Sequence, residues 1–474
     1  MVWLQHGARS MLQRLPEPGR WLSPVAALVL VLLPLTDSRL PLGLVTGLAL
    51  VLLACAAPRG PLLALPITLG LVYQPVPIGL GGARVSASEL LIVASAAGAG
   101  LRATWSLIRH PGRSLAVLVG ALEQISGLRF SGPAIGLLIV GTVSLGTLAD
   151  NTHLRESLRE YRWVVVEPVV AYFLYIWYLR EPSDRWRVVS GWIASATAVG
   201  LYSMLAGLTG SGVLVEGVLR ISGVHPHPNA LALYLERPLL LAATLALLGV
   251  GQRALWAGAA ILLVSAVLLT FSRGALASVV VTLSLACLFA RRYREALVLA
   301  GVMGSVAFAL VLTAPERILT LFQGGSGTLR LHVWSAAFSM LRDYPLFGVG
   351  LDQFLYQYVP RYVAPEAWPE RFTSHPHNLA LDAWLRLGLA GVTLLACGAI
   401  ILLRCLLLAG RQRNTLAIAA SWAIVVGGIH GLVDNGYFLP DLALAFWLLA
   451  AILELELSRP AQHGVASRSG LGQA

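Results

Sequence analysis

The sequence predicts an all-α integral membrane protein, a polytopic transmembrane bundle of about 12–14 spans with one large, partly helical outer (periplasmic) loop. Of the 474 residues, 57% are hydrophobic and only 12% are charged, about half the charged fraction of a typical soluble domain. The mean hydropathy is +0.75. Apolar runs long enough to cross a bilayer follow one another along the chain, with no soluble domain between them. These three observations exclude an ordinary water-soluble protein.

The apolar runs give the expected order of the spans. The first two are short and either cross separately or form one re-entrant pair, which leaves the total at twelve or fourteen. No small-residue cleavage site follows the first run, so we expect an uncleaved first span rather than a signal peptide. The runs fall at roughly 21–36, 40–57, 62–80, 86–104, 132–149, 162–179, 188–208, 229–250, 254–271, 274–290, 296–313, 378–408, 414–433 and 437–457.

The basic residues indicate the topology. The chain has 34 basic and 23 acidic residues, a net charge of +11, and every basic residue is an arginine. When the spans alternate from a cytoplasmic N-terminus, 20 arginines fall on the cytoplasmic side, as the positive-inside rule requires. Both termini are therefore expected in the cytoplasm. The arginines are scattered between apolar runs, so nucleic acid is not the predicted partner. The other 14 lie on the outer side or within spans, where an arginine is costly and usually meets an anion or a carboxylate.

We expect residues 1–474 to form one membrane domain, with N-terminal spans over 1–214, a region over 215–457 that carries the polar motifs and a cytoplasmic tail over 458–474. Within the region over 215–457 lies the outer loop, 314–377, which is unusually long for this chain and therefore has an expected function. It is predicted to contain two amphipathic helices, around 328–342 and 350–363, rich in aromatic residues that suit a membrane interface or sugar stacking.

Two segments at the outer ends of spans carry arginines suited to an anion. The first, LRISGVHPHPNALALYLER, places Arg220 before a span and the neighbours Glu236 and Arg237 inside it. Those neighbours are expected to form structural ion pairs with other helices. In the second, TFSRGALAS, Arg273 opens a span beside Gly274, so a planar guanidinium lies next to the free amides of a helix N-terminus. This combination suits a diphosphate, although a tight hairpin with a snorkelling arginine gives the same pattern.

The third polar segment, FTSHPHNLALDAWLRLGLAG, closes the outer loop and enters a span. His377 falls at the start of the helix, where a neutral imidazole is suited to act as a general base. Ser374 or Asn378 is expected to cap that helix. Asp382 and Arg386 are four residues apart, so an ion pair between them is the ordinary expectation.

No cofactor or metal is expected. The four cysteines sit in apolar runs and form no CxxC, so neither a disulfide framework nor a zinc site is predicted. The chain also has no DxD pair for a metal-bound sugar nucleotide, no GxxxxGK[ST] and no GxSxG.

Four ordered motifs and a late element resemble the O-antigen ligase and O-antigen polymerase superfamily of bacterial inner-membrane proteins. They are RISGVHPHPNALA, TFSRGALA, RLHVWSAAFSMLRDYPLFGVGLDQF and HPHNLALDAWLRLGLAGV, followed by GLVDNG before the last span. The resemblance covers roughly residues 215–455, and the N-terminal half matches in hydropathy alone.

The resemblance implies a metal-independent glycosyltransferase that moves a glycan from undecaprenyl diphosphate to an acceptor hydroxyl at the periplasmic face of the inner membrane. It implies Arg220 and Arg273 as diphosphate ligands, with Arg330 as a third, and His377 as the base, with His375 as the competing assignment. Where the family often has a glutamate shortly before the glycine of the histidine helix, this chain has Arg386. Either Asp382, one turn earlier, supplies the carboxylate, or that role is absent.

Two questions stay open at this stage. The acceptor is either lipid A–core, which makes the protein a ligase, or a further repeat unit, which makes it a polymerase; ligase is weakly preferred. The alternative class is a secondary transporter for an anion such as bicarbonate, but transporters place paired ionisable residues near the bilayer midplane. Here the polar groups gather at the outer ends of the spans, which favours the enzyme. The glycan and the oligomeric state are not predicted.

Overall fold

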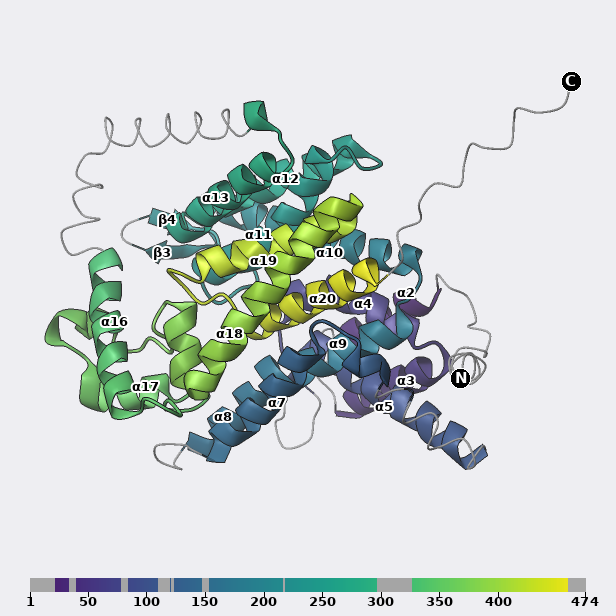
Figure 1. Ribbon diagram of the computed structural model, residues 1–474, viewed down its shortest axis with the longest axis horizontal. Helices are drawn as coiled ribbons and strands as arrows, with labels where there is room; N and C mark the ends of the chain where they lie inside the picture. The colour runs from purple at the N-terminus through teal and green to yellow at the C-terminus, as the bar shows by residue number, and fades with distance from the viewer. Residues whose placement is uncertain are drawn as a thin grey trace, which may run out of the picture.

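The computed structural model describes residues 22–33, 40–77, 84–109, 120, 123–146, 153–215, 218–295 and 326–458 (Figure 1). Helices make up most of these residues. The strands among them form two short antiparallel hairpins, β1 (Val76–Pro77) with β2 (Arg84–Val85), and β3 (Val213–Val215) with β4 (Val218–Arg220). The predicted all-α class is confirmed.

The helices of the N-terminal half follow the apolar runs. A π-helical turn over Arg162–Val166 joins α8 to α9 without a break, so this helical rod begins before the span predicted at 162–179. The helices are α2 (Leu22–Leu32), α3 (Leu40–Ala56), α4 (Arg59–Thr68), α5 (Ala87–Arg109), α7 (Ser131–Gly146), α8 (Leu154–Tyr161), α9 (Glu167–Tyr178) and α10 (Pro182–Leu208).

The C-terminal half adds the helices that carry the polar motifs. The predicted span at 296–313 lies outside the described residues, as do residues 314–325 of the outer loop and 459–474 of the tail. The described helices are α11 (Pro228–Leu247), α12 (Arg253–Leu269), α13 (Arg273–Phe289), α16 (Ser326–Asp343), α17 (Phe354–Gln357), α18 (Leu379–Gln412), α19 (Thr415–His430) and α20 (Pro440–Leu457).

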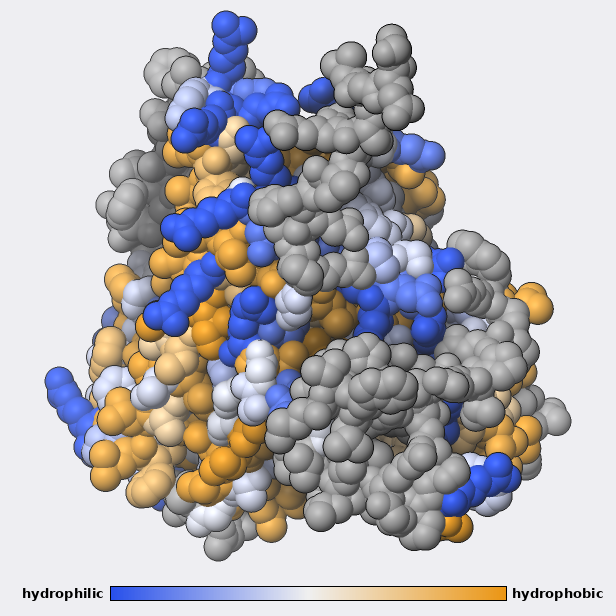
Figure 2. All heavy atoms as spheres, turned by 45° about the vertical axis from the view of Figure 1, so that its right-hand side comes forward, coloured by the Kyte–Doolittle hydropathy of each residue, from blue (hydrophilic) through white to orange (hydrophobic). Residues whose placement is uncertain are grey.

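The outer surface of the bundle is suited to lipid. Four described helices, α5, α10, α11 and α18, are long and apolar enough to cross a membrane by length and composition, and shorter apolar helices accompany them. Large apolar side chains such as Leu52, Ile261 and Leu403 point outward, each at least 57% exposed. Figure 2 shows such hydrophobic side chains over much of the described surface. A polytopic membrane protein is therefore confirmed, while the number of spans stays a prediction.

A second, smaller core explains why the outer loop is folded. Apolar side chains of α16, among them Val333 and Met340, pack against Phe354 and Tyr358 of the following segment and against Leu385 of α18. The predicted helix at 328–342 is thus confirmed, whereas the one predicted at 350–363 begins later, with α17 and a π-helical turn over Tyr358–Tyr362. In Figure 1, α16 and α17 lie at one end of the molecule, next to the first turns of α18 and far from α2–α5.

The loop is fastened to α18 at a kink. Gly388 has a φ of +69° and interrupts the helix, and Gly348 in the facing turn has a φ of +68°. The backbones approach closely, with Val349 N–H donating to Leu385 O at 2.7 Å and Leu389 N–H donating to Leu346 O at 3.0 Å. Only glycine has both the backbone freedom and the small volume for these two positions. The first turns of α18 are thereby held as part of the loop.

Candidate active site

His377 and Asp434 form the centre of the polar cluster at the outer end of the bundle. The Nδ1 atom of His377 lies 3.3 Å from Oδ1 of Asp434. The imidazole is 18% exposed and the carboxylate only 5%. A carboxylate on Nδ1 fixes the tautomer in which Nε2 carries the lone pair, because the bridging proton belongs on Nδ1. Nε2 faces the hydroxyl of Thr373 at 3.2 Å, so the basic nitrogen lies on the side away from Asp434.

Two chain segments hold this pair together. The segment that begins α18 bonds to the turn after α19, with Leu379 N–H donating to Gly431 O at 2.6 Å and Asn378 Nδ2 donating to Leu432 O at 3.0 Å. The Asn378 side chain also caps α18, accepting from two backbone N–H groups of its first turn, which confirms one of the two expected caps. His377 itself has a φ of +52°, a left-handed conformation that only surrounding structure maintains in a non-glycine residue.

Arg330 brings the outer loop to the same carboxylate. Its Nη2 atom lies 3.2 Å from Oδ2 of Asp434, and its side chain is 25% exposed. Burial alone would raise the pKa of Asp434, but the hydrogen bond from His377 and the surrounding histidines hold that pKa well below its usual range. Asp434 is therefore an anion that ties α16, the start of α18 and the α19–α20 turn into one site.

His375 lies beside His377 but is arranged differently. The two rings are T-shaped with centroids 4.3 Å apart, and the backbone N–H of His377 donates to Nδ1 of His375 at 3.2 Å. That bond makes Nδ1 the unprotonated nitrogen and leaves the proton of the neutral ring on Nε2. Burial, together with the nearby His377, lowers the pKa of His375 to about 3. His375 is thus a neutral donor at physiological pH.

The two other predicted arginines lie on elements whose neighbouring residues interact with this cluster. Arg220 ends β4 and precedes His227, whose side chain accepts from Asn229 N–H at the N-terminus of α11. Burial lowers the pKa of His227, and the charge of Arg220 lowers it further, while Asp434 acts in the opposite direction. Arg220 and Asp434 are therefore each within electrostatic reach of His227.

Arg273 begins α13, as predicted, and lies three residues after Thr270, the C-cap of α12. The next residue, Gly274, is close to the ring of His430, because a Cβ at Gly274 would lie 2.7 Å from His430 Nε2. The charge of His430 also acts on Asp434. Arg273 thus lies one residue before the glycine that borders His430.

Asp382 is engaged by an arginine of its own helix. Its Oδ1 accepts from Arg386 Nε at 2.6 Å, and Arg386 also bonds Glu160 of α8. The ordinary ion pair is confirmed. Asp434 is the carboxylate that lies on Nδ1 of His377, and a role for Asp382 in place of the family's carboxylate stays a prediction. Likewise, Glu236 and Arg237 are buried within the bundle, where Glu236 bonds His430 Nδ1 at 2.8 Å and Arg237 bonds Gly436 O at 2.7 Å.

Sequence reasoning missed three groups. Asp434, Glu160 and His430 come from segments far apart in the chain, and all three contact predicted site residues or their neighbours. For Asp434 a signal was present, since the GLVDNG element places a carboxylate in the turn before the last helix. Glu160 lies in the polar LRESLREY helix, which gave no sign that it would meet α18.

The cluster also has the donor set of a cation site. One ligand atom from each of His375, His377 and Asp434 lies within 4.8 Å of the other two, and two imidazoles with a carboxylate suit zinc or iron. Two features oppose a cation there: Nδ1 of His375 accepts a backbone N–H, and Arg330 already bonds the carboxylate. The charges of the site favour an anion beside a neutral imidazole.

Comparison with known proteins gives one match. Residues 258–396 match the family model described as O-Antigen ligase, which includes α13, α16 and the start of α18 with its histidine pair. No curated protein matches the chain. The resemblance drawn from the sequence motifs is therefore confirmed at the level of the superfamily.

Proposed function

We propose that this chain, whose residues 258–396 match the O-antigen ligase family model, transfers a glycan from undecaprenyl diphosphate to an acceptor hydroxyl. The observation that carries this proposal is the His377–Asp434 pair, bonded at 3.3 Å, with Arg330 on the same carboxylate. A carboxylate-oriented histidine beside guanidinium groups is the arrangement that this reaction needs.

The proposed step is a displacement at the anomeric carbon. The acceptor oxygen forms a bond to that carbon, its proton passes to Nε2 of His377, and Asp434 stabilises the imidazolium that results. The bond from the anomeric carbon to the diphosphate oxygen breaks, and its electron pair leaves with the diphosphate. Arg220, Arg273 and Arg330 are the proposed cations that stabilise this charge, and attack from the opposite face inverts the anomeric centre.

The surroundings of the two histidines support His377 as the base. His375 uses Nδ1 to accept a backbone N–H, and its lowered pKa of about 3 makes it a poor proton acceptor. His377 has the opposite arrangement, with Nδ1 on a carboxylate and Nε2 directed to a hydroxyl. We therefore assign proton removal to Nε2 of His377 and a hydrogen-bonding role to His375.

The proposed location is the bacterial inner membrane, with both termini in the cytoplasm and this site at the periplasmic face. The positive-inside distribution of the arginines supports that orientation. For the acceptor we prefer lipid A–core, which makes the protein a ligase, over a repeat unit, which makes it a polymerase. Membrane lipid surrounds the exposed apolar side chains.

The test is transfer by the purified full-length chain, with undecaprenyl-diphosphate glycan as donor and either lipid A–core or repeat unit as acceptor. We expect product with one acceptor, and loss of product in His377→Ala and Arg273→Ala. His332→Ala, which removes another histidine of the outer loop, is the matched control and retains activity. Full activity in His377→Ala would contradict the assignment of the base. Failure of both acceptors, together with anion flux in proteoliposomes, would favour a transporter instead.

A further inference from the structure

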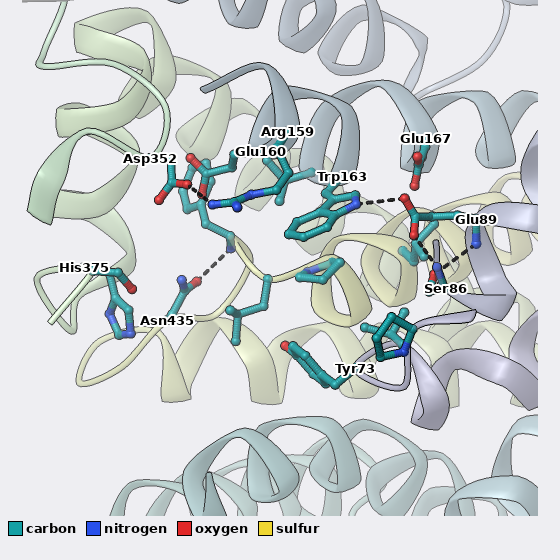
Figure 3. Close-up of a pocket in the computed structure, with 18 of the residues that line it drawn as sticks. Tyr73, Ser86, Glu89, Arg159, Glu160, Trp163, Glu167, Asp352, His375 and Asn435 are labelled. Carbon is teal, nitrogen blue, oxygen red and sulfur yellow. Dashed lines mark hydrogen bonds and ion pairs between the residues drawn. The ribbon is translucent and has the colours of Figure 1, made fainter. Parts of the chain in front are cut away.

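A separate cavity of about 350 Å³ adjoins the active site on the side of His375 (Figure 3). It lies between the N-terminal helices and the late turn before α20, with walls from α5, α8 and α9. His375 is the member of the histidine cluster that lines it; His377, Asp434 and the three proposed diphosphate arginines do not. His375 therefore stands between the proposed reaction centre and this cavity.

The charge of the cavity is opposite to that of the arginine side. Four carboxylates line it, against the guanidinium groups of Arg159 and Arg386. Arg386 is held between Glu160 and Asp382, and Arg159 bonds Asp352 at 2.9 Å. Those cations are thus already neutralised, so the cavity disfavours a phosphate and admits a neutral or cationic ligand. The lining carboxylates are Glu89, Glu160, Glu167 and Asp352.

Several polar groups of the wall lack partners among the described residues. The Glu167 side chain is only 7% exposed, and its one ion pair, with Arg162 Nε at 3.3 Å, is the sole polar contact found for that carboxylate there. Asn435 is 1% exposed, and its Nδ2 has no hydrogen-bond partner, nor has Oε2 of Glu160. Those two unpaired atoms are themselves fully buried, so the Glu167 carboxylate is the group of this wall suited to a ligand that brings hydroxyl donors.

An aromatic ring completes the wall. The indole of Trp163 lies between Arg159 and Glu89 in Figure 3, and its Nε1 donates to Glu89 Oε1 at 2.9 Å. That bond fixes the orientation of the ring, and the guanidinium carbons of Arg159 and Arg162 lie over it, 5.4 and 5.9 Å from its centroid. An oriented indole beside carboxylates suits a pyranose, because the part of the indole that the arginines leave uncovered packs on sugar C–H groups while the carboxylates accept from hydroxyls.

We propose that this cavity is a saccharide subsite for a neutral or amino sugar of the acceptor, with Glu167 and Trp163 as its main contacts. The assignment rests on the proposed transferase function, because it names the substrate part that the same active site receives. The acceptor, rather than the donor, follows from charge: the diphosphate belongs with the arginines, and the attacking hydroxyl must approach the anomeric carbon from the other side. His375 Nε2–H, at the boundary, is placed to donate to the acceptor.

The test uses the full-length protein in nanodiscs and varies donor and acceptor separately. In Glu167→Gln and Trp163→Leu we expect the acceptor KM to rise by about tenfold, the effect of about 1.4 kcal/mol, with the donor KM within twofold of wild type. Trp256→Leu is the matched control, because this tryptophan of α12 lines another cavity. An unchanged acceptor KM, or a rise in the donor KM instead, would overturn the proposal.

A binding measurement separates this proposal from the proposed function. Saturation-transfer NMR with the methyl glycosides of a neutral sugar, an amino sugar and a uronic acid needs no turnover. We expect signals from the first two on the wild-type protein, a weaker signal from the uronic acid, and loss of both signals in Trp163→Leu but not in Trp256→Leu. Binding without any glycan transfer would refute the transferase function and leave the subsite standing. Transfer without binding that depends on Trp163 would refute the subsite alone.

Discussion

Replacing Asp434 by asparagine isolates the role of one charge in the proposed site. Oδ1 of Asp434 accepts from His377 Nδ1 at 3.3 Å and from Asn435 N–H at 2.8 Å, while Oδ2 bonds Arg330 at 3.2 Å. An asparagine oxygen can satisfy the first two donors, so the shape of the turn is kept. Its NH2 group would then face Arg330, and no anion would remain to stabilise the imidazolium.

The structure indicates that catalysis suffers more than folding. Arg330 is a quarter exposed and His377 nearly a fifth, so water replaces part of what they lose, and we expect a stability loss of about 1 kcal/mol. Removing the carboxylate that orients a catalytic histidine typically costs ~10²–10⁴-fold in rate, which is about 3–5 kcal/mol in the barrier. The rate effect therefore dominates.

The assay is single-turnover glycan transfer at saturating donor and acceptor, with the rate expressed per folded molecule from a thermal melt. Asp343→Asn is the control, since this exposed carboxylate of α16 bonds only Tyr362 among the described residues. A rate for Asp434→Asn within threefold of wild type would refute the claim that this carboxylate orients the base. Because the pKa of Asp434 is lowered in the folded protein, its stabilising charge is present above about pH 4, the ordinary aspartate value, and is lost only at lower pH.

Three further predictions concern the surroundings of the base. Gly274→Ala should lower the transfer rate, because its Cβ would lie 2.7 Å from His430 Nε2 and displace the start of α13. The control is Gly258→Ala, which has open space at its Cβ and should be neutral or slightly stabilising. Equal transfer rates for the two variants would contradict the close approach of Gly274 to His430. Burial lowers the pKa of His375 to about 3 in the folded protein, whereas the unfolded chain takes up a proton on this ring below about pH 6.5, so stability is lost as the pH falls from about 6.5 toward 3. Thermal melts should show a shallower acid loss in His375→Gln, and a parallel decline would contradict the buried neutral ring. Arg330→Ala should raise the donor KM more than the acceptor KM in steady-state kinetics, and the reverse order would remove Arg330 from the diphosphate site.

Local signals in the sequence were sufficient for most of the fold. Each described helix that spans the bundle coincides with an apolar run, because the length and composition of a run are local properties that the bilayer selects directly. The start of α13 at Arg273 and the cap at Asn378 were predicted for the same reason. The second loop helix began later than predicted, because the turn before it is fixed by backbone contacts with the kinked α18, and aromatic patterning carries no information about such contacts.

Which residues pair with one another in the site could be learned only from the three-dimensional structure. His377 and Arg330 were found from their motifs, but the carboxylate they share lies 57 residues beyond the histidine, in a turn that sequence spacing does not connect to either. Asp382 was the nearest acidic residue in sequence, yet an (i, i+4) ion pair with Arg386 engages it. Proximity along the chain favours local ion pairs, whereas the long-range partner follows only from how α16, α18 and α19 pack.

The claim that His377 removes the acceptor proton is tested most directly by chemical rescue. His377→Gly keeps the left-handed backbone at this position, since glycine adopts a φ near +52° without strain, and it leaves room for an added imidazole. In single-turnover transfer we predict a rate at least ~10²-fold below wild type, partly restored by imidazole and not restored in Arg273→Ala. Wild-type transfer by His377→Gly without imidazole would contradict the assignment of the base.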